Sequence, residues 1–256
     1  MYLDEIVDHV REETARRRRA TPPSELRDRP LFHLPTRHFG ESLKGESRRI
    51  IAEVKRASPS RGLIREEFDP AKIASDFAAN GASALSVLTE GRFFQGSLLY
   101  LEEIKGKVAL PLLRKDFILD RYQLLEARSF GADAVLFIAA LLDSVLLSDL
   151  REEARSLALD ALIEVHTEAE LERALKAGAR LIGINNRDLG TFEVKLETSE
   201  RLMPLVPPGI EVVCESGIES PEQIRRLEGL GARIFLVGEA LMRAPDPAAK
   251  LRELLT

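Results

Sequence analysis

The chain has 256 residues, of which 45% are hydrophobic and 31% charged, and its 37 basic and 42 acidic residues give a net charge of −5. This length suits one domain of barrel size, and the negative charge argues against a nucleic-acid partner. A single cysteine, Cys214, excludes an internal disulfide and a multi-cysteine metal site and favours a cytoplasmic location. No apolar run approaches the roughly 18 residues that a membrane span needs, so no membrane partner is expected.

The first 48 residues precede the first predicted strand. Leu3, Ile6, Val7 and Val10 fall on one helical face, and prolines punctuate the stretch from residue 22 to residue 35. The arginines at 16–19 stand beside two glutamates, a pattern typical of a solvated helix face rather than of a nucleic-acid site. We predict that residues 1–48 form a helical extension packed on the rest of the chain.

A weak internal repeat organises the remainder. Four times a helical pattern ends at Gly-Ala and a short apolar run follows; the glycines are Gly81, Gly131, Gly178 and Gly231. Between these copies lie further apolar runs at residues 111–114, 160–165 and 211–214, and another, at residues 49–54, precedes the first copy. Eight apolar strands that alternate with eight helices predict an α/β fold, a (β/α)8 TIM barrel, with residues 1–256 as a single domain.

Helix boundaries support this count. Asp-Pro or Ser-Pro pairs at residues 69–70, 220–221 and 246–247 place a capping side chain before a proline that starts a helix. Thr167 with Glu170, and Ser220 with Gln223, fit the capping box. The glycine of each Gly-Ala pair fits a left-handed cap at the end of a helix.

Polar side chains follow the predicted strands at the end where barrels carry out their chemistry. They are Glu53, Lys55, Lys115, Glu164, Asn185 and Glu215. Because alternate strands of a barrel contribute to common layers, the charged residues of the odd-numbered strands should converge. Such a cluster costs desolvation energy unless its members pair or bind a ligand, which favours a functional role. A purely structural pairing of Lys55 with Glu53 is the alternative.

Glycine-containing turns follow the seventh and eighth strands, at residues 215–218 and 237–240. Loops in this position, together with the start of a short helix, form the usual phosphate site of a barrel because free backbone N–H groups and the helix dipole face the anion. The two turns therefore favour a phosphate site at the end of these strands.

Two further residues invite a chemical role that their context argues against. His166 follows Glu164 closely and is a candidate general base, but its place between a strand and a helix favours a loop or capping role. Cys214 lies inside an apolar run and is expected to be a small buried residue rather than a nucleophile.

The segment IIAEVKRASPSRG, residues 50–62, resembles the signature of the indole-3-glycerol phosphate synthases, a Glu-x-Lys followed by Ser-Pro-Ser. The resemblance continues through LTEGRFFQGS, LLRKDF, LIEVHTEAE, IGINNRDL, CESGI and VGEALM, across nearly the whole chain. It implies a carboxy-lyase of tryptophan biosynthesis, which closes the indole ring of 1-(2-carboxyphenylamino)-1-deoxyribulose 5-phosphate with loss of carbon dioxide and water. No cofactor or metal is implied. Ala240 stands where serine is common, which affects at most one phosphate contact.

The resemblance also implies roles for single residues. Lys115 would be the general acid, Glu164 the acid or base of the dehydration, and Lys55 a holder of the charged substrate groups, although which lysine donates in which step stays open. Glu53, Asn185 and Glu215 would bind substrate hydroxyls. Ser58 and Arg187 would orient charged groups, and Phe94 would form a wall against the aryl ring. Backbone donors to the phosphate would come from Ser216, Gly217, Gly238 and Glu239. The loop at residues 56–68 is expected to close over the ligand.

Two other functions fit the residues less well. A different phosphate-binding barrel, such as a phosphosugar isomerase, would use the same phosphate site for other chemistry. A non-catalytic barrel would use the charged residues to sense or hold a ligand. The sequence leaves open whether the chain is a monomer or a homodimer.

Overall fold

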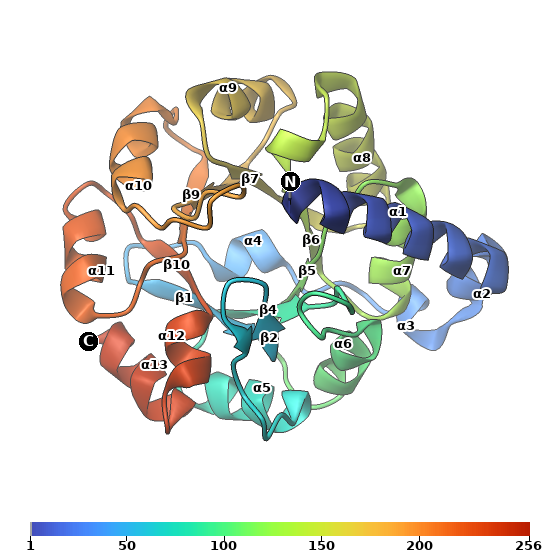
Figure 1. Cartoon of the computed structure of the whole chain (residues 1–256), viewed down its shortest axis with the longest axis horizontal. Coiled ribbons are helices and arrows are strands. Elements are labelled where there is room, and N and C mark those ends of the chain that lie inside the picture. Colours follow the sequence, from blue (N-terminus) through green and yellow to red (C-terminus); the bar gives the residue numbers. More distant parts are fainter. Residues whose placement is uncertain (1) are drawn as a thin grey trace.

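The computed structural model describes residues 2–256 and is a closed barrel of eight parallel strands surrounded by helices (Figure 1). The strands are β1 (Arg49–Val54), β4 (Ala84–Leu88), β5 (Leu112–Lys115), β6 (Ala134–Ile138), β7 (Asp160–Val165), β8 (Leu181–Asn185), β9 (Glu211–Glu215) and β10 (Ile234–Val237). Each pairs with the next, and β10 pairs back to β1. The predicted TIM barrel is confirmed. One strand begins a residue later than predicted, at Leu112 rather than Pro111, since proline has no N–H to give a ladder.

Helices follow the strands in the expected order: α5 (Pro70–Ala79), α6 (Leu98–Lys105), α7 (Arg121–Ser129), α8 (Ser144–Ser156), α9 (Glu168–Lys176), α10 (Glu197–Leu202), α11 (Pro221–Glu228), α12 (Glu239–Arg243) and α13 (Pro247–Leu255). Short 3-10 turns, η1 (Ala139–Leu141) and η2 (Met203–Leu205), follow β6 and α10. The glycines of the four repeats all have positive φ, between 80° and 100°, as a left-handed cap requires.

The predicted caps form, with one change. Asp69 and Asp246 accept backbone N–H groups at the starts of α5 and α13, and α11 has the reciprocal box of Ser220 with Gln223. At α9, Thr167 caps the Glu170 N–H, but the Glu170 carboxylate accepts the N–H of His166, one residue before the expected one. The box predicted at this helix is therefore shifted toward the preceding strand.

The extension before β1 is helical, as predicted. It consists of α1 (Tyr2–Ala20), α2 (Pro23–Asp28), α3 (Pro30–His33) and α4 (Phe39–Ser42). The proline-rich stretch, predicted as a connection, forms the two short helices α2 and α3, because Pro23 and Pro30 stand at first-turn positions that need no N–H. Phe39 and Leu43 are fully buried in the cluster of side chains inside the barrel. Figure 1 shows α4 behind the strands and α1 in front of them.

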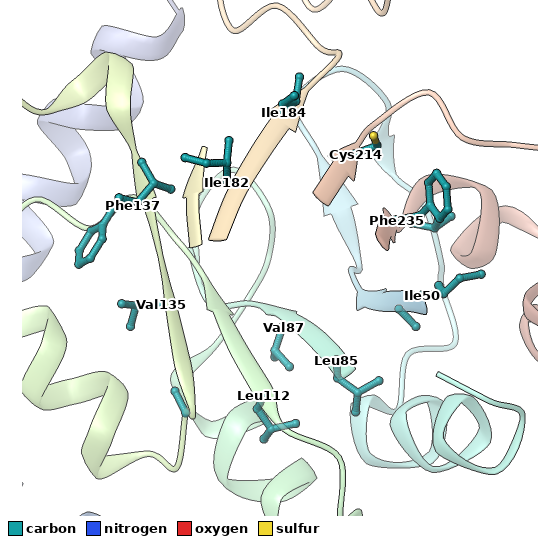
Figure 2. Packing of buried hydrophobic residues seen from close by; sticks show 14 of the residues in the cluster. Ile50, Leu85, Val87, Leu112, Val135, Phe137, Ile182, Ile184, Cys214 and Phe235 are labelled. Carbon is teal, nitrogen blue, oxygen red and sulfur yellow. The ribbon is translucent and has the colours of Figure 1, made fainter. Parts of the chain in front are cut away.

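The core has two layers because alternate residues of each strand point to opposite sides. Outward-facing side chains pack between the strands and the helices, and they include Ile50, Leu85, Leu112, Phe137, Ile182, Cys214 and Phe235 (Figure 2). Cys214 is a buried apolar residue, as predicted. Inward-facing residues such as Ile51, Leu113, Leu162, Val213 and Ile234 fill the barrel from the other end. The next inward positions on β1, β5, β7 and β9 are charged, whereas β10 has Leu236 there, so the odd-numbered strands of the barrel place a polar layer at the C-terminal face.

A small hairpin follows β1. Its strands are β2 (Ala57–Ser58) and β3 (Gly62–Leu63), which pair in antiparallel fashion. Gly62 has a positive φ of 65° beside this turn.

Among residues 2–256 no helix combines the length and the apolar character needed to cross a membrane.

Candidate active site

A cavity of about 550 Å³ opens at the C-terminal face of the barrel. All thirteen residues predicted for the site line it: Glu53, Lys55, Ser58, Phe94, Lys115, Glu164, Asn185, Arg187, Glu215, Ser216, Gly217, Gly238 and Glu239. Residues from both ends of the sequence thus meet in one place because the eight strands run in the same direction. This volume lies in the range that is usual for small-molecule pockets.

Lysines and glutamates form the floor of this cavity, here called the inner cluster (Glu53, Lys55, Lys115, Glu164 and Glu215). The Lys115 Nζ lies 2.8 Å from Glu164 Oε2 and 3.6 Å from Glu215 Oε2. A second pair joins Lys55 Nζ to Glu53 Oε1 at 2.6 Å. Charges of opposite sign are thus paired among the residues that line the cavity.

Burial and neighbouring charges shift the pKa values of this cluster in different directions. Burial by itself would lower the pKa of Lys115, but the three surrounding carboxylates outweigh it and hold that pKa above its ordinary value. Burial favours a higher pKa for Glu164, yet the positive charges of Lys115 and His166 hold it below the usual range. Burial raises the pKa of Glu215, and the carboxylate of Glu164 adds to the rise despite the charge of Lys115. A proton donor and an ionised acceptor therefore stand side by side, the pattern expected of acid-base chemistry.

Two glycines make room for the carboxylates. A Cβ at Gly183 on β8 would overlap Glu215 Oε1, and a Cβ at Gly238 after β10 would overlap Glu53 Oε1. Glu215 Oε1 is buried and has no hydrogen-bond partner. Asn185 at the end of β8 donates toward Glu164 and accepts the backbone N–H of Arg187 at 2.9 Å. An acceptor without a partner in a cavity is the kind of group that a ligand satisfies.

The other end of the cavity carries backbone donors and arginines. Ser216 and Gly217 both have positive φ, 66° and 75°, in the turn after β9, and Gly238 is the residue before α12. Glu239, predicted as a backbone donor, also places its carboxylate here: Oε1 lies 2.8 Å from Arg61 Nε and Oε2 lies 3.0 Å from Arg187 Nη2. The two arginines are thus gathered around one negative group, an arrangement that suits an anion.

A family model and curated relatives carry the same name and match nearly the whole chain. A family model described as "Indole-3-glycerol phosphate synthase" matches residues 3–254. The chain belongs to the indole-3-glycerol phosphate synthase family. A protein of that name from Dehalococcoides mccartyi (strain CBDB1) is 50% identical, with 100% of both chains covered. Another from Roseiflexus sp. (strain RS-1) is 49% identical and covers 98% of this chain and 97% of its own length.

Solved structures of other enzymes share the fold. A 3-hexulose-6-phosphate synthase from Salmonella typhimurium superposes with a TM-score of 0.65 at 17% identity, covering 81% of this chain and 96% of its own. KGPDC from Streptococcus mutans gives a TM-score of 0.63 at 14% identity, covering 82% and 96%. At this identity the likeness shows the barrel alone.

Several residues that line the cavity could not be predicted from the sequence. Leu3 and Ile6 of α1 line the cavity and pack in the same cluster as Phe94, whose ring centre lies 6.1 Å from that of Phe117. The helical face that contains Leu3 and Ile6 was visible in the sequence, but which part of the barrel it covers depends on tertiary packing. Arg61 was visible only as one basic residue of a predicted mobile loop.

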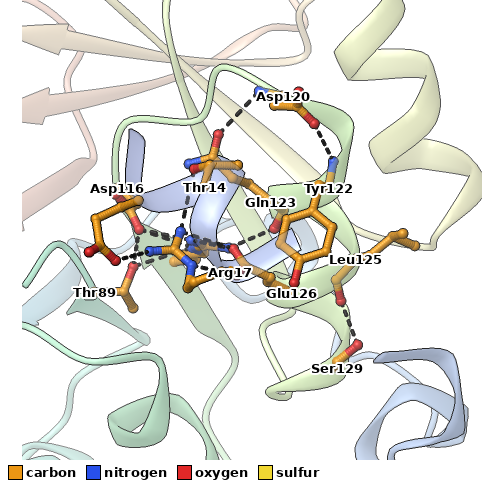
Figure 3. A network of polar contacts seen from close by, with 12 residues as sticks. Thr14, Arg17, Thr89, Asp116, Asp120, Tyr122, Gln123, Leu125, Glu126 and Ser129 are labelled. Atoms are coloured by element: carbon orange, nitrogen blue, oxygen red, sulfur yellow. Dashed lines mark hydrogen bonds and ion pairs between the residues drawn. The ribbon is translucent and has the colours of Figure 1, made fainter. Parts of the chain in front are cut away.

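A second charged cluster, here called the outer cluster, lies on the other side of β5 (Arg114, Asp116, Glu126, Arg17 and Thr89). The Arg114 side chain is fully buried, and its Nη2 lies 2.9 Å from Asp116 Oδ2 and 3.3 Å from Glu126 Oε2. From α1, the Arg17 Nε reaches Glu126 Oε1 at 2.6 Å. Figure 3 shows Arg17, Glu126, Asp116 and Thr89 joined in one network. This cluster ties the extension to the strand that carries Lys115.

Metal ligation has no support in the described residues. Between residues 2 and 256 the structure has no group of three or more His, Cys, Asp or Glu side chains arranged to hold a metal ion. The three glutamates of the inner cluster instead contact its two lysines, Glu53 through Lys55 and the other two through Lys115.

Proposed function

We propose that this chain closes the indole ring of 1-(2-carboxyphenylamino)-1-deoxyribulose 5-phosphate, with loss of carbon dioxide and water, to give indole-3-glycerol phosphate. Membership of the synthase family supports the reaction. The observation that carries the assignment of residues is the position of Lys115 between Glu164 and Glu215, in a cavity whose other end collects backbone donors and arginines.

Lys115 is the proton donor of the first step in this proposal. The aryl carbon that bears the carboxylate attacks the ketone carbon, and the carbonyl oxygen takes the proton of the Lys115 ammonium. The carboxylates around Lys115 keep it protonated before the step. Loss of carbon dioxide then restores the aromatic ring, and the new hydroxyl group remains on the five-membered ring.

Glu164 serves the dehydration. Departure of the hydroxyl as water leaves a positive charge shared with the ring nitrogen, and loss of a ring proton completes the indole. An ionised Glu164 stabilises that charge and can accept the proton. Glu215, whose pKa is raised by burial, is the neighbouring group that can hold a proton for the leaving hydroxyl. Glu53 and Asn185 then bind substrate hydroxyls.

The remaining cavity residues position the substrate. Backbone N–H groups of Ser216, Gly217, Gly238 and Glu239 would hold the phosphate at the start of α12. Ser58, Lys55 and Arg187 would orient the charged groups, and Phe94 would form a wall against the aryl ring. Exclusion of water by this wall strengthens the charged contacts.

We further propose that the extension and the barrel act as one domain. Leu3 and Ile6 of α1 line the same cavity as the strand ends, and Arg17 is joined to Glu126 of α7. An extension that supplies part of the cavity wall cannot move away without opening it. The cytoplasmic location and the monomer-or-homodimer state predicted from the sequence stay predictions.

The test is the reaction itself. The purified chain is mixed with the anilino-ribulose phosphate, without metal or nucleotide, and indole fluorescence and released carbon dioxide are followed together. Equal amounts of both products are expected. Binding of the substrate without carbon dioxide release would favour a non-catalytic barrel, and turnover of a phosphosugar alone would favour an isomerase.

A further inference from the structure

His166 stands directly behind the inner cluster but outside the cavity. It follows β7, which ends one residue after Glu164, and precedes the Thr167 cap of α9. The described residues that line the cavity do not include it. Its contacts run instead to two carboxylates, one on the strand and one on the helix.

The imidazole bridges these two carboxylates. Its Nδ1 lies 3.2 Å from Glu170 Oε2, and the same oxygen accepts the His166 backbone N–H at 2.7 Å. Its Nε2 lies 3.4 Å from Glu164 Oε1. Lys115 contacts the other oxygen of that carboxylate, Oε2, at 2.8 Å. The two oxygens of Glu164 therefore face two different nitrogen groups.

The Nε2 atom is buried and has no hydrogen bond of good geometry in the structure. Buried polar atoms without a partner are rare and costly, so a small rotation that completes the contact to Glu164 is favoured. Glu170 holds both the ring and the backbone of His166, so it keeps the imidazole beside Glu164 and leaves it only a small rotation. The pairing of histidine with Glu164 is thus built from the start of α9.

We propose that His166 is a positioning residue of the reaction, held by Glu170 against Glu164 Oε1 so that Glu164 keeps its orientation and its negative charge. The proposal rests on the function proposed above. Lys115 gives up its proton in the first step, and Glu164 then loses the positive charge beside Oε2. A second positive group at Oε1 keeps the carboxylate ionised for the dehydration that follows.

The surroundings favour the charged form of the imidazole. Burial by itself would lower the pKa of His166, but Glu170 and Glu164 outweigh it and raise that pKa above its ordinary value. The charged groups that face His166 come from several elements: Glu164 on β7, Glu170 on α9, Glu215 on β9, Asp188 after β8, and Arg201 on α10, whose guanidinium donates to the His166 carbonyl. Carboxylates are in the majority in this set.

Wild type and His166→Gln are compared over the pH range from about 6 to about 9.5, and the ratio of their kcat values is plotted. Titrating groups that do not interact with His166 cancel in this ratio, whereas the effect of the His166 charge on Glu164 and Glu215 remains in it. We expect wild type to be roughly 10 to 50 times faster near pH 6, with KM changed less than about threefold. As pH rises through the raised pKa of His166, the wild-type imidazole loses its charge and the ratio should fall to about 3 or less.

Glu170→Gln tests the same role of His166 independently, through the pH profile of kcat. It keeps an oxygen for the His166 N–H but removes the charge beside the imidazole, so the kcat decline should begin at lower pH than in wild type. Asp143→Ala removes an N-cap from the neighbouring helix α8 and is the control for helix destabilisation. It should lower the melting temperature and leave the pH profile of kcat unchanged.

The outcomes separate the two proposals. If wild type turns over the substrate but the ratio is flat with pH, or if Asp143→Ala reproduces the loss, His166 has no positioning role and the proposed function stands. If wild type itself shows no turnover, both proposals fall. Should His166→Gln fail to fold, the shift of the wild-type profile by Glu170→Gln decides the question, since an unchanged profile overturns the inference.

Discussion

Lys115 and Arg114 are neighbours on β5, and their side chains enter two charged clusters on opposite sides of the same strand. Lys115 points into the barrel, toward Glu164 and Glu215. Arg114 points outward, toward Asp116 and Glu126. Both clusters are buried and both combine cations with carboxylates. They differ in how completely their polar atoms are satisfied.

In the outer cluster each charge has its partners. Arg114 donates to Asp116, Thr89, Glu126 and the carbonyl of Gln123, and Thr89 Oγ1 bonds Asp116 Oδ2 at 2.5 Å. In the inner cluster Glu215 Oε1 has no hydrogen-bond partner, and the adjoining His166 Nε2 has only the ion-pair contact to Glu164 Oε1 at 3.4 Å. Buried charge by itself therefore does not mark an active site. An incomplete set of hydrogen bonds beside a cavity is the better sign.

The largest effect that separates the clusters is expected on turnover. Lys115→Met should lower kcat by roughly 10² to 10⁴, since it removes the general acid. Its effect on stability should be small, because Glu164 and Glu215 border the cavity and can take up a proton or water when the cation is lost. Steady-state kinetics and a urea titration of the same sample measure both. Normal turnover in this variant would remove Lys115 from the mechanism.

The converse is expected for Arg114→Met. Asp116 and Glu126 would remain buried without their shared cation, a loss of about 3 to 5 kcal/mol in the free energy of unfolding. Arg17→Met is the matched control, since Arg17 is partly exposed and contacts Glu126 only from the outside; its loss should be clearly smaller. Urea midpoints compare the two, with kcat measured on the folded protein. Equal stability of Arg114→Met and wild type would show that the outer cluster is dispensable.

Much of this arrangement could be predicted from the sequence because it follows from local patterns. Continuous apolar runs marked the strands, and the bounds predicted for β1 and β7 agree with the structure at both ends. Since the C-terminal ends of parallel strands lie at one face of the barrel, the sequence predicts that Lys115 and Glu164 lie close together. The glycine caps at the repeats could also be predicted from the sequence, because the left-handed backbone conformation at the end of a helix favours glycine by itself.

The rest depends on tertiary packing. Leu3 and Ile6 form an apolar face whatever they cover, so their place in the cavity wall was not visible. The sequence places Arg114 at the end of an apolar run. No local pattern shows that it pairs with Glu126 of α7, which in turn contacts Arg17 of α1. The sequence predicts a loop or capping role for His166, and its backbone N–H does donate to the Glu170 carboxylate. The approach of its ring to Glu164 depends on the conformation of the turn after β7, which the sequence does not show.

The smallest of the expected effects concerns the space beside the unpartnered oxygen of the inner cluster. A methyl group at Gly183 would overlap Glu215 Oε1, so Gly183→Ala should displace this carboxylate and lower kcat by roughly 10- to 100-fold, as small misplacements in active sites do. Shortening the displaced side chain should relieve the overlap. Gly183→Ala with Glu215→Asp is therefore expected to be faster than Gly183→Ala alone, although Glu215→Asp by itself slows the enzyme. Kinetics of the four proteins test this, and losses that simply multiply would mean that Gly183 serves the fold of β8 rather than the position of Glu215.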